Sequence, residues 1–209
     1  AAETLNVAVC QLTSIDDVGA NLKQIESLLS ELESSPPDLV CFPENSLYLR
    51  LREGARVQAL SLDDPAIRTL SAWAVRFKSS IHLGSVPLTC DGLLFNASVL
   101  LGADGSVRDV YHKIHLFDVD VVGHKPVRES DAFAPGNEPS TFMVNGWKIG
   151  STICYDLRFS ELFLRYAQTV DAILIPSAFL VPTGRAHWGI LTRARAIECQ
   201  AYVLAAAQG

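Results

Sequence analysis

A cysteine stands where an apolar segment meets an amphipathic one in "IGSTICYDLRFSEL", residues 149–162. Small and apolar residues precede Cys154 and apolar residues at helical spacing follow it, which predicts a turn between a strand and a helix. Ligands of α/β proteins bind beyond the carboxyl ends of strands. The N-terminus of a helix also offers N–H groups that favour a thiolate or hold an oxyanion. Cys154 is therefore a candidate nucleophile, and the alternative is a buried structural cysteine.

Two charged residues follow other predicted strands. Glu44 comes after the apolar "LVCFP", and Lys113 comes after "VRDVYH". A carboxylate, an ammonium group and a thiol at one rim of a sheet would suffice for amide hydrolysis. Glu44 would move the protons, and Lys113 with the Tyr155 N–H would stabilise the negative tetrahedral oxygen. The alternatives are a capping or surface role for Glu44 and a solvated position for Lys113.

The histidines and the remaining cysteines form no comparable set. His112 and His115 are expected on opposite faces of a strand, and no histidine has an evident orienting partner. Neither HExxH nor CxxC occurs in the sequence, so we expect no metal site and no cofactor. The odd number and the scatter of the five cysteines argue against a disulfide framework. Structural roles are expected for Cys10, Cys41, Cys90 and Cys199.

Length and composition predict one globular domain over residues 1–209. The chain is 49% hydrophobic and 19% charged, which suffices for one sizeable core. Its net charge of -6 comes without a basic cluster, so we expect neither nucleic acid nor an anionic membrane as a partner. No apolar run approaches the roughly 18 residues of a membrane span, and the first residues do not resemble a secretory signal. We therefore expect a cytoplasmic protein whose partners are small molecules.

Strand patterns alternate with helix patterns along the chain. Strands are expected at 5–12, 38–42, 81–88, 94–116 (a hairpin about "ADG"), 141–153, 171–179 and 202–208. Helices are expected at 22–32, 65–77, 159–168 and 186–201, with a loop at 117–139. This alternation predicts an α/β fold, and the hairpin predicts a mixed sheet.

The segments around the three candidates also resemble the signature of the nitrilase superfamily of carbon–nitrogen hydrolases. "CFPENSL", "YHKIHLFD" and "ICYDLRFSEL" follow the family's order, and "PSAF", "TGRAHW" and "RARAIE" extend the resemblance over nearly the whole chain. The resemblance implies a four-layer α-β-β-α sandwich with mixed sheets, pairing into dimers, and a catalytic triad of Glu44, Lys113 and Cys154 that forms a thioester. It also implies that Glu129 positions substrate or water, with an exposed loop carboxylate as the alternative.

Within the superfamily the chain looks most like the Nit branch, which includes ω-amidases and deaminated glutathione amidases. This implies hydrolysis of the terminal carboxamide of a small, carboxylate-bearing substrate of the deaminated glutathione type, with release of ammonia. The alternatives are an ω-amidase acting on α-ketoglutaramate, a non-catalytic interaction protein that keeps the fold, and a redox-sensing thiol. Members of the family usually run further, so their C-terminal segment is expected to be absent.

Residues near the nucleophile are candidates for substrate binding. Tyr155 follows it directly, and Arg158 could bind a substrate carboxylate in bidentate fashion. An ion pair of Arg158 with Asp156 or Glu161 is the alternative. Phe179 and Thr183 follow another predicted strand end and could line the pocket, or simply pack within their loop.

Overall fold

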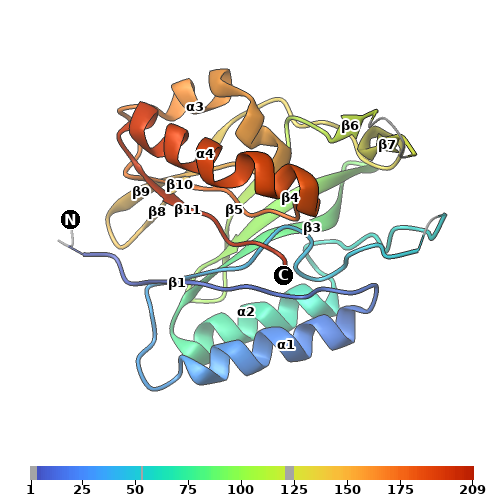
Figure 1. The fold of residues 1–209 in the computed structure, drawn as a ribbon. Coiled ribbons are helices and arrows are strands. Elements are labelled where there is room, and N and C mark those ends of the chain that lie inside the picture. Colours follow the sequence, from blue (N-terminus) through green and yellow to red (C-terminus); the bar gives the residue numbers. More distant parts are fainter. Residues whose placement is uncertain (1–3, 53, 121–124) are drawn as a thin grey trace.

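Two β-sheets pack face to face between two layers of helices in the computed structural model, which describes residues 4–52, 54–120 and 125–209 (Figure 1). Helices α1 (Val18–Glu31) and α2 (Pro65–Phe77) cover the outer face of one sheet. Helices α3 (Ser160–Tyr166) and α4 (Val181–Cys199) cover the outer face of the other. The α-β-β-α sandwich that the resemblance implied is confirmed.

The first sheet has the strand order β1-β2-β3-β4-β5. These strands are β1 (Val7–Val9), β2 (Leu39–Cys41), β3 (Ser80–Cys90), β4 (Leu93–Leu101) and β5 (Val107–His112). The first three run parallel, whereas β4 is antiparallel to both β3 and β5. The predicted hairpin and the mixed sheet are therefore confirmed.

The second sheet has the strand order β11-β10-β9-β8. Its strands are β8 (Ser140–Val144), β9 (Trp147–Ser151), β10 (Ala172–Leu174) and β11 (Tyr202–Leu204). The single strand expected over residues 141–153 was wrong, because β8 and β9 are the two arms of a hairpin. Asn145 and Gly146 have φ angles of 49° and 81°. Both residue types tolerate this left-handed backbone, which a two-residue hairpin turn requires.

Turn residues decide where the helices begin, at the expected position for α2 and at a different one for α4. Asp64 caps α2 by accepting a hydrogen bond from the Ala66 N–H, and Pro65 occupies the first turn. Helix α4 begins at Val181 instead of residue 186, since Pro182 in its first turn needs no N–H acceptor. No helix among the described residues is both long and apolar enough to cross a membrane.

The segment expected as a loop at 117–139 contains short regular elements. Strands β6 (Asp118–Val119) and β7 (Val127–Arg128) pair in antiparallel fashion, and a 3₁₀ helix, η1 (Glu129–Asp131), follows directly. Residues 121–124, which belong to the expected loop, lie outside the described residues. Because β7 leads straight into η1, this hairpin determines where Glu129 lies.

An apolar layer between the two sheets holds the sandwich together. It is made of side chains from both sheets: Leu39, Cys41, Leu100, Phe142, Val144, Ile149, Ala172, Leu174 and Ala206. Val40, between Leu39 and Cys41, belongs instead to the layer under α1 and α2. Strands of the first sheet are thus buried on both faces, which explains their nearly continuous apolar sequence.

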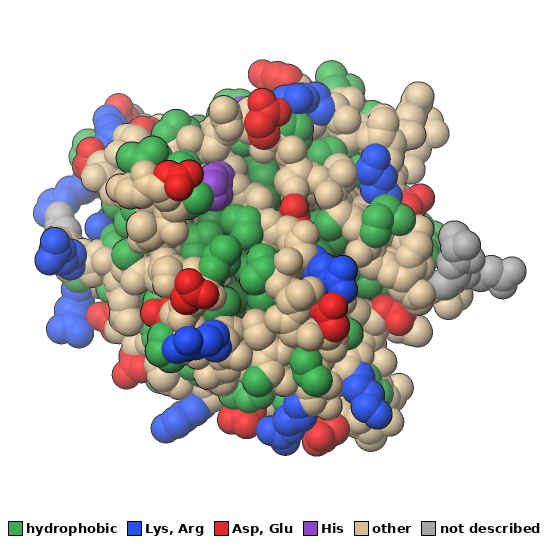
Figure 2. Space-filling view, turned by 180° about the vertical axis from the view of Figure 1, so that it is seen from behind, with side chains coloured by type: hydrophobic (Ala, Val, Ile, Leu, Met, Phe, Trp, Pro, Cys, Tyr) green, Lys and Arg blue, Asp and Glu red, His purple; other side chains and the backbone are tan. Residues whose placement is uncertain are grey.

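The molecular surface carries charges of both signs. On the face drawn in Figure 2, Lys and Arg side chains lie around the edge together with Asp and Glu, while hydrophobic side chains gather nearer the centre. This face therefore has a mixed surface, with charged side chains of both signs.

Candidate active site

Cys154 lies at a tight turn where the second sheet gives way to helix. Strand β9 ends at Ser151, and Cys154 begins a 3₁₀ helix, η2 (Cys154–Arg158). The φ angle of Cys154 is 46°, a left-handed conformation that is strained for a residue with a Cβ atom. Its N–H donates to the Pro176 carbonyl oxygen at 2.9 Å, which ties the turn to the segment after β10. The predicted strand-to-helix turn is confirmed.

Glu44 spans the gap between the two sheets. It follows β2, is only 5% exposed, and its Oε2 accepts a hydrogen bond from the Ala178 N–H at 3.0 Å. Ala178 belongs to the segment after β10 of the other sheet. A capping or surface role for Glu44 was therefore the wrong alternative.

Lys113 follows β5 and its side chain is only 1% exposed. Its Nζ lies 2.9 Å from Glu44 Oε1 and 2.9 Å from Glu129 Oε2. Burial disfavours the charged ammonium, but Glu44, Glu129 and the nearby Cys154 outweigh burial and raise the pKa of Lys113 above its ordinary value. Lys113 is thus a buried cation held between two carboxylates, and the solvated alternative was wrong.

Glu129 points inward from η1 instead of into solvent. Its Oε2 accepts hydrogen bonds from the Phe117 N–H at 2.6 Å and from Lys113 Nζ. The side chain of Glu129 is 12% exposed. The alternative of an exposed loop carboxylate was wrong, because the β6–β7 hairpin turns Glu129 toward the sheets.

The thiol of Cys154 is surrounded by groups that oppose its ionisation. Burial raises the pKa of Cys154 well above its ordinary value, and the Glu44 carboxylate raises it further, while Lys113 lowers it. The expectation that the helix N-terminus favours a resting thiolate does not hold here. These influences favour the neutral thiol, so ionisation of Cys154 calls for a proton acceptor nearby.

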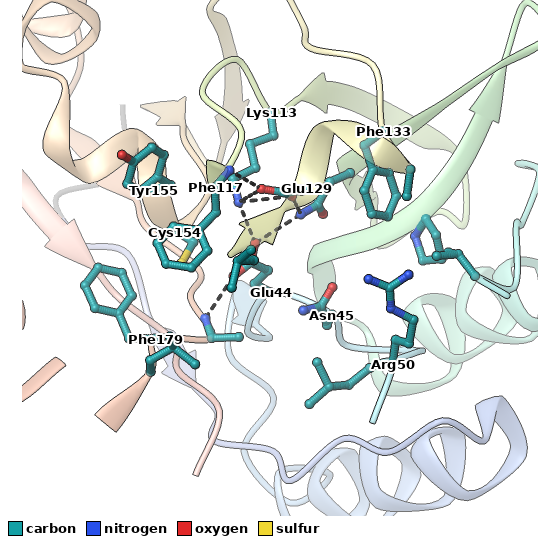
Figure 3. Close-up of a pocket in the computed structure, with 18 of the residues that line it drawn as sticks. Glu44, Asn45, Arg50, Lys113, Phe117, Glu129, Phe133, Cys154, Tyr155 and Phe179 are labelled. Atoms are coloured by element: carbon teal, nitrogen blue, oxygen red, sulfur yellow. Dashed lines mark hydrogen bonds and ion pairs between the residues drawn. The ribbon is translucent and has the colours of Figure 1, made fainter. Parts of the chain in front are cut away.

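These side chains border one cavity of about 330 Å³. All eight residues singled out from the sequence line it: Glu44, Lys113, Glu129, Cys154, Tyr155, Arg158, Phe179 and Thr183. Figure 3 shows Glu44, Lys113 and Glu129 joined by polar contacts, with Cys154, Tyr155 and Phe179 on one side of them and Arg50 on the other. Residues more than a hundred positions apart in the chain thus share one site.

Arg158 is held by a histidine and two aromatic rings. Its Nη1 lies 3.1 Å from His187 Nδ1, which must be the acceptor because a guanidinium only donates. The guanidinium carbon lies 5.9 Å from the Tyr155 ring and 5.5 Å from the Phe179 ring, within the range of cation–π attraction. The ion pair considered for Arg158 with Asp156 or Glu161 is not formed, and His187 does have a partner.

A buried carboxylate that the sequence did not reveal joins the lysine and cysteine segments. Asp156 accepts hydrogen bonds from the Tyr111 hydroxyl at 2.7 Å and the Ile153 N–H at 3.0 Å. It also accepts from the His115 N–H at 2.9 Å and lies 2.7 Å from His115 Nδ1. The absence of an orienting partner expected for His115 was therefore wrong. No sequence signal distinguished Asp156 from a surface residue of η2.

Several polar residues that line the cavity were missed, among them Asn96 and Arg50. Asn96 is a lone amide within the apolar strand "LLFNASVLL", which was the available signal, and it is 3% exposed. Arg50 lies in a segment without regular structure, where no pattern marked it. Within the described ranges, no group of three or more His, Cys, Asp or Glu side chains is arranged to hold a metal ion.

Residues 6–209 match the family model described as carbon-nitrogen hydrolase. The chain belongs to this family. It is 40% identical to the deaminated glutathione amidase of Yersinia enterocolitica over 210 residues, which cover 97% of this chain and 73% of that protein. It is 38% identical to the omega-amidase NIT2 of Mus musculus over 208 residues, which cover 97% of this chain and 74% of that protein. The predicted class, a carbon–nitrogen hydrolase acting on amides, is confirmed.

Solved structures of the family agree with the sandwich described above. The NitFhit protein of C. elegans superposes with a TM-score of 0.87 at 30% identity, over 98% of this chain and 51% of that chain. Nit3 of Saccharomyces cerevisiae, a member of branch 10 of the nitrilase superfamily, gives a TM-score of 0.83 at 28% identity, over 98% of this chain and 76% of that chain. This hydrolase therefore has the nitrilase-superfamily fold.

Proposed function

We propose that this hydrolase cleaves the amide bond of a small, carboxylate-bearing substrate through a thioester on Cys154. The observation that carries the proposal is the contact of Lys113 Nζ with both Glu44 and Glu129, beside the thiol and inside one cavity. The cavity provides a nucleophile, a proton acceptor, a cation and a second carboxylate. These are the groups that acyl transfer from an amide requires.

Acylation begins when Glu44 accepts the thiol proton while the Cys154 sulfur bonds to the amide carbon. The electron pair of the carbonyl double bond moves to oxygen, and Lys113 with the Tyr155 N–H stabilises that oxyanion. The carbonyl then re-forms, the carbon–nitrogen bond breaks, and Glu44 returns its proton to the leaving nitrogen. The products of this half are an amine and an acyl thioester.

Deacylation repeats the sequence with water as the nucleophile. Glu44 takes a proton from water as its oxygen bonds to the thioester carbon, and the carbon–sulfur bond then breaks. The proton returns to sulfur, which regenerates the neutral thiol. Glu129, held by Lys113 and the Phe117 N–H, is placed to orient this water or the substrate.

The deaminated glutathione amidases and omega-amidases among the relatives suggest the acyl group. Deaminated glutathione and α-ketoglutaramate are both γ-amides of 2-oxoglutarate, so each would leave the same 2-oxoglutaryl thioester on Cys154. Only the leaving group differs: cysteinylglycine from the first, and ammonia from the second. The ammonia release expected above therefore applies to a primary amide. We propose deaminated glutathione as substrate, with α-ketoglutaramate as the alternative.

The acyl group carries a carboxylate, for which the cavity offers a cation. We propose that Arg158 binds it, between the rings of Tyr155 and Phe179. Thr183 donates its hydroxyl proton to the Leu180 carbonyl oxygen at 3.0 Å, which leaves the Thr183 oxygen free to accept a further hydrogen bond.

The test is to incubate the enzyme with each amide and to measure the release of ammonia, cysteinylglycine and 2-oxoglutarate. The intact mass of the enzyme is measured as well. We expect turnover and a mass increase equal to the 2-oxoglutaryl group. Cys154→Ala, Glu44→Gln and Lys113→Ala should each remove turnover, whereas Cys90→Ala, a cysteine outside the cavity, should retain it. Failure of the wild-type enzyme on both amides would favour the non-catalytic alternative, and full activity of a site variant would remove that residue from the mechanism.

We also propose that two copies of the chain pair. Apolar side chains are exposed on the outer helices, where Ile190 and Ile197 of α4 are 70% and 77% exposed and Leu164 of α3 is 58% exposed. Burying such side chains between copies would be favourable. Light scattering should give a dimer that Ile190→Glu weakens, and a monomeric wild type would contradict this proposal.

The cytoplasm is proposed as the working compartment, and residues 1–209 as one folding unit. Support for the first comes from the free thiols of all five cysteines, which suit a reducing environment. Support for the second comes from the apolar layer shared by the two sheets. Cell fractionation tests the proposed compartment. Thermal unfolding tests the single folding unit, which should give one transition.

A further inference from the structure

Asn96 closes a ring of hydrogen bonds around the two carboxylates of the site. Its Nδ2 donates to Glu44 Oε1 at 3.0 Å and to Glu129 Oε1 at 2.8 Å. Lys113 Nζ donates to the same two oxygens at 2.9 Å and 3.2 Å. Two donors and two acceptors thus alternate around a closed cycle, whose carboxylate and ammonium members are labelled in Figure 3.

The orientation of the Asn96 amide follows from this ring. Only the NH₂ group can face two carboxylates, because the amide oxygen would be repelled by both. Its Oδ1 is consequently turned away, and no donor among the described residues reaches it. A buried acceptor without a donor costs stability. Asn96 therefore lies where packing alone would favour an apolar side chain, as at most other positions of β4, and its unpaired oxygen calls for a functional reason.

The ring also decides which oxygen of Glu44 can take a proton. Oε1 already accepts hydrogen bonds from Lys113 and Asn96. Oε2 accepts from the Ala178 N–H, which lies beside the Cys154 sulfur as well. A proton arriving from the thiol would therefore reach Oε2.

We propose that Asn96 is a positioning residue that holds the Glu44 and Glu129 side chains side by side and presents Glu44 Oε2 to the thiol. The inference rests on the proposed catalytic roles of these two glutamates. An amide suits the task because it adds two donors without adding charge. A second cation at this position would weaken Glu44 as a base, and a third carboxylate would add repulsion.

The test compares Asn96→Leu, which has a similar size and no donor, with Asn96→Ser, which keeps one donor. For Asn96→Leu we expect kcat to fall roughly tenfold to a hundredfold, a part of the about 10² to 10⁴ contributed by general acid–base catalysis. KM should change little, because Asn96 acts through the glutamates. The acid limb of the pH profile of kcat/KM should move to higher pH, since two carboxylates without these donors accept protons more readily. Asn96→Ser should lie between wild type and Asn96→Leu.

Asn21→Leu is the matched control. Asn21 is also a buried asparagine, but its Nδ2 donates to the Ile15 and Leu47 carbonyl oxygens, away from the cavity. The Asn21→Leu variant should lower Tm without moving the pH profile of kcat/KM. Wild-type kcat and an unmoved acid limb in both Asn96 variants would overturn the proposal.

A second readout separates this inference from the proposed function. If the wild-type enzyme hydrolyses neither amide, the proposed substrate fails, and the rate of Cys154 alkylation by iodoacetamide is then measured against pH. Glu44→Gln identifies the part of that profile that depends on Glu44 as a base. A shift of this part to higher pH in Asn96→Leu supports the positioning role, and a profile equal to that of wild type refutes it.

Discussion

Glu44 and Cys154, the proposed base and the proposed nucleophile, lie close enough for the carboxylate to influence the thiol. The neighbouring carboxylate and burial keep the thiol protonated, because they raise the pKa of Cys154. The positive charge of Lys113 offsets part of the negative charge of the two carboxylates. The carboxylates in turn raise the pKa of the Lys113 ammonium. The site therefore favours a neutral thiol beside a charged ammonium.

The Glu129 side chain offers a direct test of the second carboxylate. Glu129→Gln keeps the size and one acceptor for the Phe117 N–H, but it removes the negative charge beside Lys113. We expect kcat to fall by about 10² or more while the protein stays folded, a loss typical of one positioned acid–base group. Steady-state kinetics with thermal unfolding is the measurement. Glu138→Gln, an exposed glutamate outside the cavity, is the control and should behave as wild type.

Elements of the fold are tied together at Asp156, which is fully buried in η2. The Asp156 carboxylate accepts hydrogen bonds from the Tyr111 hydroxyl and the His115 N–H, on either side of Lys113 in the chain. It also accepts one from the N–H of Ile153, which precedes Cys154. One carboxylate thus fixes the lysine segment relative to the nucleophile turn. This explains how a strained Cys154 backbone is maintained.

Removing that carboxylate should loosen both segments at once. Asp156→Ala leaves several buried donors unpaired, at about 1 to 3 kcal/mol for each, so we expect a large loss of stability together with reduced kcat. Tyr111→Phe removes a single donor and should cost about 1 kcal/mol with nearly normal kcat. Urea denaturation and kinetics on both variants are the measurements. Equal stability of Asp156→Ala and wild type would contradict this account.

His82 makes the interface between the sheets sensitive to acid. It lies on β3, is 1% exposed, stacks on Phe142 at a centroid distance of 6.0 Å, and finds no hydrogen-bond partner among the described residues for either ring nitrogen. Burial lowers the pKa of His82 to about 3, against 6.5 for a solvent-exposed histidine. The folded state therefore excludes a proton that the unfolded chain binds below pH 6.5.

The sign of the resulting pH dependence follows from linkage. Above pH 6.5, the pKa of His82 in the unfolded chain, the imidazole is neutral in both states and does not change the free energy of unfolding. As the pH decreases from 6.5 toward about 3, the unfolded chain binds a proton that the folded state excludes, so stability falls. Between pH 7 and pH 5 the free energy of unfolding should drop by about 2 kcal/mol on this account. His82→Leu should reduce this dependence in urea unfolding at the two pH values. An unchanged difference between them would show that other groups cause it.

At the scale of the whole molecule, the site depends on how closely the two sheets approach. Gly84 of β3 lies where a Cβ atom would come within 2.1 Å of the Phe42 carbonyl oxygen and 2.4 Å of Pro176 Cβ. Phe42 leads to Glu44 in one sheet, and Pro176 binds the Cys154 N–H from the other. Only glycine allows this approach, so Gly84 determines how far Glu44 lies from Cys154.

Gly84→Ala should therefore harm activity more than its size suggests. We expect a loss of about 1 to 3 kcal/mol of stability from overpacking, and up to roughly a 10²-fold loss of kcat if the reacting groups shift by about 1 Å. Gly19→Ala is the matched control, because Gly19 lies exposed in α1 with only Asp17 Oδ1 at 3.4 Å, and alanine favours helix. Thermal unfolding and kinetics compare them, and normal kcat in Gly84→Ala would contradict the argument.

Local patterns sufficed to predict much of this protein. The hairpin at 94–116, the turn at Cys154 and the charged residues after β2 and β5 follow from the alternation of apolar residues and from turn residues, which depend on neighbours in the chain. Patterns also missed the β8–β9 hairpin, where two apolar strands were interpreted as one across Asn145 and Gly146.

Only the tertiary structure decided the chemistry of the site. Whether Lys113 and Cys154 carry charge depends on burial and on partners far along the chain, and neither is visible in a local pattern. The same holds for Asn96 and Asp156, whose roles arise from hydrogen bonds that cross between segments. Sequence alone indicated which groups could react, while the packing of two sheets determined which of them meet and in which protonation state.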